Sequence, residues 1–204
     1  KIVYPIPSDD YMYSHGDWRY IYIDGDGTQH YFKLDNNKTI DADGLGLTLT
    51  ETTEGSQPII EISDLQDNKL TFNNPDSEHG IYVLKNQSDN KGNITTYAYS
   101  DGKITGITDA AGRLTAITYI NGTNKVSKIT VADGKEVNFS YDGERLKEIF
   151  YPENMKTSYE YDHQGRLCLV STNEGSGRSV KYEYASNDKD SLNFFKVRSV
   201  TEYG

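Results

Sequence analysis

The stretch that decides the fold runs from residue 159 to residue 170 and reads Tyr159-Glu-Tyr161-Asp162-His-Gln-Gly165-Arg166-Leu167-Cys-Leu-Val170. Two tyrosines at alternate positions, a glycine-containing turn signal and a second apolar run predict two short strands joined by a tight turn. The same phrase, with phenylalanine in first place, occupies residues 139–149. A phrase that recurs in this way indicates a repeat architecture.

The second tyrosine of the phrase returns at nearly constant spacing. Tyr99, Tyr119, Tyr141, Tyr161 and Tyr184 are separated by 20, 22, 20 and 23 positions. Most of them precede a turn signal and a second short strand with an apolar anchor. We therefore predict an all-β fold of successive antiparallel hairpins, each about 20 residues long, that together form a curved or spiralling sheet.

The recurring residues are interpreted as structural. They are Tyr99, Tyr119, Tyr141, Asp142, Gly143, Tyr161, Asp162, Gly165 and Tyr184. We expect the tyrosines to stack on their neighbours across strands, and the aspartates and glycines to form turns. A catalytic group occurs once in a chain, whereas a turn residue occurs in every unit, so none of these residues is predicted to be catalytic.

Charge separates the chain into two parts. Residues 1–85 hold 15 acidic and 6 basic side chains, a net charge of −9, whereas residues 86–204 hold 16 and 15, a net charge of −1. We predict an acidic, irregular β segment over 1–85 and the regular repeat sheet over 86–204. Within the first part, residues 18–23 and 29–34 predict a hairpin, and residues 45–50 predict a further strand.

Composition excludes several classes of partner. An acidic chain repels phosphate backbones, which argues against nucleic acid and anionic membrane surfaces. No apolar stretch approaches the roughly 18 residues of a membrane helix, so membrane insertion is not expected. The chain begins with Lys1-Ile-Val-Tyr rather than Met, and we expect it to be a piece of a longer protein.

One aromatic stripe is a candidate binding surface. Trp18, Tyr20 and Tyr22 alternate along one predicted strand and therefore share a face. Exposed rings of this kind can stack on sugars, because they offer apolar area with polar edges. The alternative is that the stripe packs into the core.

The sequence gives no sign of catalysis, cofactor or metal. The four histidines and the single Cys168 lack metal-ligand spacing. Asp24 and Asp26, and likewise Asp41 and Asp43, resemble calcium loops in their Asp-x-Asp-Gly order, but the further ligands of the EF-hand are absent. Turn formation is the favoured interpretation, and a weak calcium site shared between these loops is the alternative.

Residues 159–167 match the pattern Tyr-x-Tyr-Asp-x-x-Gly-Arg-Leu and resemble the YD repeat of Rhs-type proteins. Residues 89–99 and 108–117 resemble the same repeat, and the likeness covers residues 86–184. Residues 22–32 and 43–49 are similar to the region that precedes YD repeats in large wall-associated proteins of Gram-positive bacteria.

The resemblance implies a large secreted or cell-surface protein whose repeats form a β-sheet shell. In bacterial toxins such a shell encloses a C-terminal toxic domain, and in animal teneurins a related shell serves adhesion. It implies that this segment is non-catalytic, is not an enzyme, and has the rest of its own longer chain as its main partner. A carbohydrate-binding or adhesion role is the alternative. The chain departs from the toxin pattern in lacking the Rhs core signature with its self-cleavage aspartates, so we expect it to represent only part of a shell wall.

Overall fold

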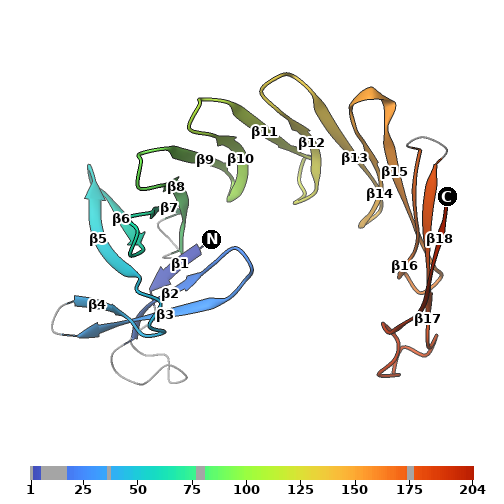
Figure 1. Ribbon diagram of the computed structural model, residues 1–204, viewed down its shortest axis with the longest axis horizontal. Coiled ribbons are helices and arrows are strands. Elements are labelled where there is room, and N and C mark those ends of the chain that lie inside the picture. Colours follow the sequence, from blue (N-terminus) through green and yellow to red (C-terminus); the bar gives the residue numbers. More distant parts are fainter. Residues whose placement is uncertain (1, 6–17, 36–37, 77–80, 174–176) are drawn as a thin grey trace. The chain divides into compact units, whose positions relative to one another are not determined.

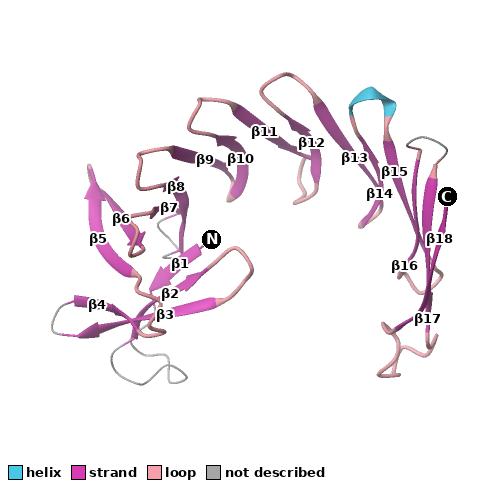
Figure 2. Ribbon diagram, viewed as in Figure 1, coloured by secondary structure: helices cyan, strands magenta, loops and turns pink. Residues whose placement is uncertain are grey.

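The computed structural model describes residues 2–5, 18–35, 38–76, 81–173 and 177–204. Strands and short loops make up almost all of this part of the chain (Figures 1 and 2). The chain divides into two compact units, Lys1–Leu114 and Thr115–Gly204. The division between the units follows Leu114, whereas the sequence predicts that the regular repeats begin near residue 86. The first hairpin of the predicted repeats, residues 94–108, therefore belongs to the N-terminal unit.

The N-terminal unit contains ten strands in the described residues. They are β1 (Ile2–Pro5), β2 (Trp18–Ile23), β3 (Gln29–Asp35), β4 (Lys38–Asp41), β5 (Thr48–Glu54), β6 (Gln57–Ser63), β7 (Lys69–Asp76), β8 (Ile81–Ser88), β9 (Ile94–Ser100) and β10 (Lys103–Thr108). The predicted hairpin of β2 and β3 is present. The strand predicted over 45–50 begins only at Thr48, because Gly44 and Gly46 take positive φ angles that end extended structure.

Two antiparallel meanders meet in this unit. One runs β2–β3–β4 and the other runs β5–β6–β7–β8–β9–β10. β1 joins them, because Ile2 pairs with Ile23 of β2 and with Val83 of β8. β8 therefore has β7 along one edge, while β1 and β9 share the other edge.

The core lies between these meanders. Its buried side chains come from both, and they are Tyr20, Tyr22, Phe32, Leu49, Ile60, Ile62, Phe72 and Leu84. Phe32 and Phe72 are fully buried. The ring of Tyr22 meets the ring of Phe72 edge to face, with 5.9 Å between centroids. The N-terminal unit thus has a closed apolar core of the kind that stabilises a domain alone.

The C-terminal unit is a single antiparallel meander. Its strands are β11 (Leu114–Tyr119), which crosses the division, β12 (Val126–Thr130), β13 (Glu136–Asp142), β14 (Arg145–Phe150), β15 (Lys156–Tyr161), β16 (Leu167–Thr172), β17 (Arg178–Tyr184) and β18 (Val197–Tyr203). Each pairs antiparallel with the next. A short 3₁₀ helix, η2 (Pro152–Asn154), is the only helix in the described residues, and it is not long or apolar enough to cross a membrane.

The prediction of an all-β fold of successive antiparallel hairpins is confirmed. The C-terminal unit differs from the N-terminal unit in its packing. Among its described residues only Phe194 and Arg166 are buried, and the strand residues are half-buried or exposed. Side chains that lie along a single sheet layer must therefore be held by contacts between neighbouring strands.

Candidate functional site

The predicted aromatic surface is not formed by Tyr20 and Tyr22. Tyr20 is 4% exposed and Tyr22 is 5% exposed, and both belong to the core cluster. Burial raises the pKa of the Tyr22 phenol to about 12. The side chain of Trp18 lies outside the described residues. The alternative interpretation, that the stripe packs into the core, therefore holds for these two tyrosines, because both meanders bury their apolar faces against this strand.

A cavity of about 300 Å³ lies beside the buried Tyr22 ring. Leu47, Ile62 and Leu70 contribute to its apolar wall, and the turn residues Asp64 and Asp89 contribute to its polar wall. Both carboxylates already accept three hydrogen bonds within their own turns. These two carboxylates are thus used by the fold.

The aspartate loops suggested as a calcium site serve as turn caps. The Asp24 carboxylate accepts bonds from the N–H groups of Asp26 and Thr28, at 3.0 and 3.1 Å. The Asp41 carboxylate accepts bonds from the N–H groups of Asp43 and Leu47. In the described residues no group of three or more side chains is placed to hold a metal ion. The hydrogen bonds match the turn interpretation of these loops.

His30 links the two aspartate loops. Its Nε2 lies 3.3 Å from Asp24 Oδ2 and its Nδ1 lies 3.4 Å from Asp43 Oδ2, while its ring stacks on Tyr22. The side chain is only 14% exposed. The hydrogen bonds that Asp24 accepts, with the Asp26 contact the largest cause, lower its pKa to about 2. The arrangement fastens the β2–β3 turn to the loop after β4.

The ladder tyrosines make a contact that sequence reasoning missed. In four of them the hydroxyl donates to a backbone carbonyl on the preceding strand: Tyr99 to Leu84, Tyr141 to Val126, Tyr161 to Leu146 and Tyr184 to Leu167, at 2.7–2.9 Å. The sequence predicts that these rings stack on one another. At Tyr141, Tyr161 and Tyr184 the structure instead shows a hydroxyl bond to a carbonyl and a cation over the ring. We call each hydroxyl bond a tyrosine–carbonyl link.

A β-bulge positions the accepting carbonyl. The residue that accepts, such as Leu146, pairs with the preceding ladder tyrosine, Tyr141, where the register shifts. The same shift occurs where Tyr119 pairs with Val126 and where Tyr161 pairs with Leu167. A bulge leaves one residue out of the regular ladder of backbone bonds. The carbonyl beside it is then satisfied by a side-chain hydroxyl from the next strand.

A cation covers the ring of each linked tyrosine in the C-terminal unit. The Lys125 ammonium lies 5.7 Å from the Tyr141 centroid, and the Arg145 and Arg166 guanidinium carbons lie 5.5 and 4.2 Å from the centroids of Tyr161 and Tyr184. Each cation directly precedes the residue whose carbonyl accepts the hydroxyl. The three parts, cation, bulged carbonyl and tyrosine, therefore recur as one unit.

Removing one hydroxyl tests this unit. In Tyr161→Phe the Leu146 carbonyl loses its partner while the ring and its Arg145 contact remain. We expect the free energy of unfolding to fall by about 0.5–1.5 kcal/mol in urea titrations followed by circular dichroism. Tyr159→Phe, two residues earlier on β15, is the matched control, because the structure shows no hydroxyl bond at that tyrosine. An equal effect of both changes would contradict the link.

A second recurring device is a five-residue turn that begins with aspartate. One carboxylate oxygen accepts from the backbone N–H groups two and four residues later, and the other accepts from the side chain four residues later. We call this an Asp-capped turn. It occurs at Asp64–Asn68, Asp89–Asn93, Asp109–Arg113 and Asp162–Arg166.

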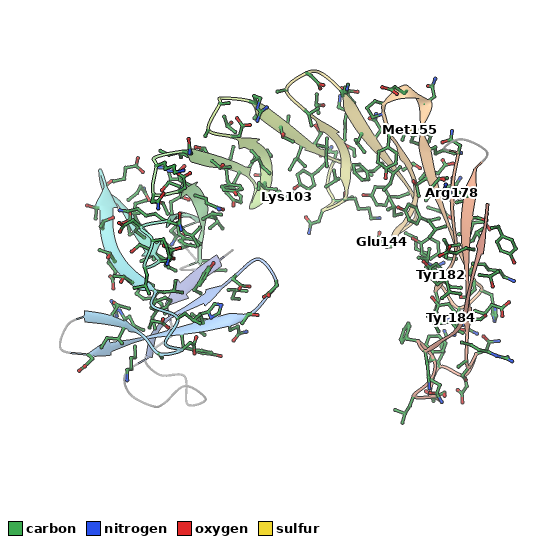
Figure 3. All side chains as sticks on the ribbon, in the orientation of Figure 1. Lys103, Glu144, Met155, Arg178, Tyr182 and Tyr184 are labelled. Carbon is green, nitrogen blue, oxygen red and sulfur yellow. The ribbon has the colours of Figure 1, made fainter. Side chains whose placement is uncertain are left out.

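Asp142 belongs to a different turn. Although it follows a ladder tyrosine as Asp162 does, it is the last residue of β13 and pairs with Arg145, so only Gly143 and Glu144 lie between the strands. Gly143 has φ 55°. The next connection, residues 151–155 between β14 and β15, is longer and contains η2. It lies at the other end of the strands, as the labels of Glu144 and Met155 show (Figure 3). The repeat phrase predicts equivalent turns at Asp142 and Asp162, and the two turns differ.

The Asp-capped turns make stability depend on pH. The bond from the Asn93 side chain, the largest cause, lowers the pKa of Asp89 below its usual range. A lowered folded pKa stabilises the fold above the unfolded value near 4, and this stabilisation is lost as the pH falls through the folded value. We expect the stability difference between the wild type and Asp89→Asn to be largest near pH 6 and to shrink below about pH 4.

A matched substitution controls for this pH dependence. Asp101→Asn alters an aspartate whose positive φ, 50°, suits asparagine equally well. Urea titrations at a series of pH values from 6 to 3 measure the stability of each variant. We expect the stability of Asp101→Asn to follow that of the wild type across this series. A constant stability difference between Asp89→Asn and the wild type from pH 6 to pH 3 would contradict the role given to the Asp89 carboxylate.

Arg166 is the buried charge of the C-terminal unit, with a side chain only 4% exposed. All five of its N–H donors have acceptors. Two bonds go to Asp162 Oδ2, and the others go to the carbonyls of Ser186 and Phe194 and to Asn187 Oδ1, at 2.6–2.8 Å. Its guanidinium also lies over the rings of Tyr184 and Phe194. We call this set of contacts the Arg166 clamp.

The Arg166 clamp holds the long connection between β17 and β18, residues 185–196. Tyr184 lies at the end of β17 where this connection begins (Figure 3). Backbone bonds, such as Ser191 N–H to the Asp188 carbonyl, order the loop further. It displays Leu192, fully exposed, and Phe195, 76% exposed. The loop is thus an ordered display of apolar side chains.

His163 and Cys168 are two further side chains of reactive types in the sequence. His163 is exposed in the turn after Tyr161. Cys168 is a half-buried free cysteine on β16, and burial, the largest cause, raises the pKa of its thiol. A raised pKa keeps the thiol protonated and unreactive. Neither residue lies in a constellation that supports nucleophilic or metal chemistry.

Comparison with known proteins gives structural likeness only. No protein-family model matches the chain. No curated protein matches it either. A crystal structure of TcdB2-TccC3-Cdc42 aligns with 92% of this chain at 16% sequence identity and a TM-score of 0.40. A crystal structure of TcdB2-TccC3-TEV aligns with 93% of this chain at 15% sequence identity and a TM-score of 0.38. The chain spans 11% of the length of each matched chain. At this level of similarity the alignments do not assign the chain to a family.

Proposed function

We propose that this chain is a non-catalytic structural segment of a larger secreted or cell-surface β-sheet protein, in which it forms part of a shell wall around or beneath another domain. The observation that carries the proposal is the recurrence of the tyrosine–carbonyl link. Hydroxyls, bulged carbonyls and cations, which could otherwise serve a binding site, are used in hairpin after hairpin to hold one strand to the next.

The difference between the two units supports this proposal. The N-terminal unit has its own core, whereas the C-terminal unit is a sheet with almost no buried apolar side chains in its described residues. A sheet layer of this kind needs neighbours on its faces or edges, as repeat proteins do. The resemblance to YD repeats gives the same expectation for the longer protein.

Labelling of the two faces of β15 tests the proposal. In a Cys168→Ser background, Tyr159→Cys and Glu160→Cys place a thiol on opposite faces of the sheet, because successive residues of a strand point in opposite directions. In this chain alone we expect both thiols to react with a bulky maleimide. In a longer polypeptide that contains the chain, we expect one face to be protected. Equal labelling of both faces there would overturn the shell role.

A further inference from the structure

The start of β18 repeats the first two parts of the recurring unit. Lys196 directly precedes Val197, as Arg145 precedes Leu146. Val197 pairs with the ladder tyrosine Tyr184 at a register shift between Glu183 and Tyr184. It therefore occupies the position that Val126, Leu146 and Leu167 hold on their own strands.

Within the part of the chain that the structure describes, no later strand supplies the third part of the unit at β18. In each earlier case the following strand supplies a tyrosine, which lies opposite the cation and donates its hydroxyl to the bulged carbonyl. In the described residues β18 is paired with β17 only. Its side chains Val197, Val200 and Tyr203 are 43%, 55% and 55% exposed. Apolar exposure along a free strand edge marks a surface that another strand can cover.

We propose that the free edge of β18 is an interaction surface for one more antiparallel strand of the repeat's own type, with tyrosine at the residue opposite Lys196. The hydroxyl of that tyrosine donates to the Val197 carbonyl, and its ring lies beneath the Lys196 ammonium. The inference rests on the proposed structural role and names the partner that the role requires.

Continuity with the existing interfaces selects this occupant. Any strand can pair with the backbone of an open edge, but an unrelated strand leaves the bulged carbonyl without a donor. The β12–β13, β14–β15 and β16–β17 interfaces all place a tyrosine at this register, 15–17 residues after the accepting residue. The edge of β18 thus carries a specific requirement beyond its backbone groups.

A tethered strand tests the proposal. The full chain is extended by a flexible Gly/Ser linker that carries a copy of residues 177–185, so that the local concentration of the strand is in the millimolar range. Hydrogen exchange of the β18 amides is the readout. We expect slower exchange over Val197–Tyr203 than in the unextended chain. When phenylalanine replaces the copy of Tyr184, we expect this protection to fall about two- to tenfold.

Two matched controls sharpen the result. Phenylalanine in place of the copy of Tyr182 should leave the protection unchanged, because that position has no bulged carbonyl opposite it. Lys196→Met should weaken protection, whereas Lys189→Met, the same change within the preceding loop, should not. Equal protection by the tyrosine and phenylalanine strands, or no protection by either, overturns the inference.

Self-association is also decided by this experiment. If the unextended chain already shows protected β18 amides and sediments as a dimer, a second copy covers the edge and the proposal is wrong. None of these outcomes alters the labelling of the two faces of β15. Failure of the strand inference is therefore distinguishable from failure of the structural role.

Discussion

Arg166→Met is expected to lower the free energy of unfolding by about 3–5 kcal/mol, because it leaves Oδ2 of the half-buried Asp162 and two loop carbonyls without their donors. Methionine keeps most of the aliphatic volume but provides no hydrogen bond. Urea titration followed by circular dichroism measures the loss. Exchange of the amides in residues 185–196 should accelerate in the same variant, since the Arg166 clamp orders that loop.

Arg113→Met is the matched control for this change. Arg113 closes an Asp-capped turn with the same local geometry, but its side chain is 72% exposed. An exposed pair contributes about 0–1 kcal/mol, so the loss should be several times smaller. Arg166→Lys should lie between the two, because lysine retains the charge and loses the planar set of five donors. Similar losses for Arg166→Met and Arg113→Met would contradict the clamp.

Phe72→Ala is expected to cost about 3–5 kcal/mol, because Phe72 is fully buried and its ring packs against Tyr22 at the centre of the N-terminal core. The cavity left between the two meanders cannot be filled by a neighbouring strand without breaking its pairing. The thermal unfolding transition of the N-terminal unit, followed by the exchange of β6 and β7 amides, measures the loss.

Phe195→Ala gives the reference for this second change. Phe195 is 76% exposed on the loop after β17, and a substitution there should alter stability by no more than about 0.5 kcal/mol. If Phe72→Ala were equally mild, the closed core of the N-terminal unit would be disproved. If Phe195→Ala were severe, the loop side chain would have to pack against the fold rather than project from it.

Period and alternation were enough to predict most strands of the repeat region, although β18 was not predicted. The ladder tyrosines mark the ends of β9, β11, β13, β15 and β17, and the glycine-containing turns follow as expected. The tyrosine–carbonyl link was missed because it depends on a bulge, which shifts the register by one residue and leaves no trace in a two-residue period. The repeated order of a basic residue, an apolar residue and a later tyrosine was the available signal.

Burial separated residues that look alike in sequence. Arg113 and Arg166 close the same kind of turn, yet only Arg166 is buried, because the loop at residues 186–194 folds back over it. In the described part of the chain, the other Asp-capped turns are not covered by such a loop, so the local phrase could not distinguish the two arginines. Tyr20 and Tyr22 show the reverse case: their alternation gave the shared face, but only the position of the second meander showed that the face is covered.

The tyrosine–carbonyl link also gives the sheet a direction. Each donor lies later in the chain than its acceptor, as Tyr141 reaches back to Val126 and Tyr161 reaches back to Leu146. During synthesis from the N-terminus, the carbonyl that accepts each link is therefore made before the tyrosine that donates to it. We therefore expect such a sheet to be able to form strand by strand from its N-terminal end.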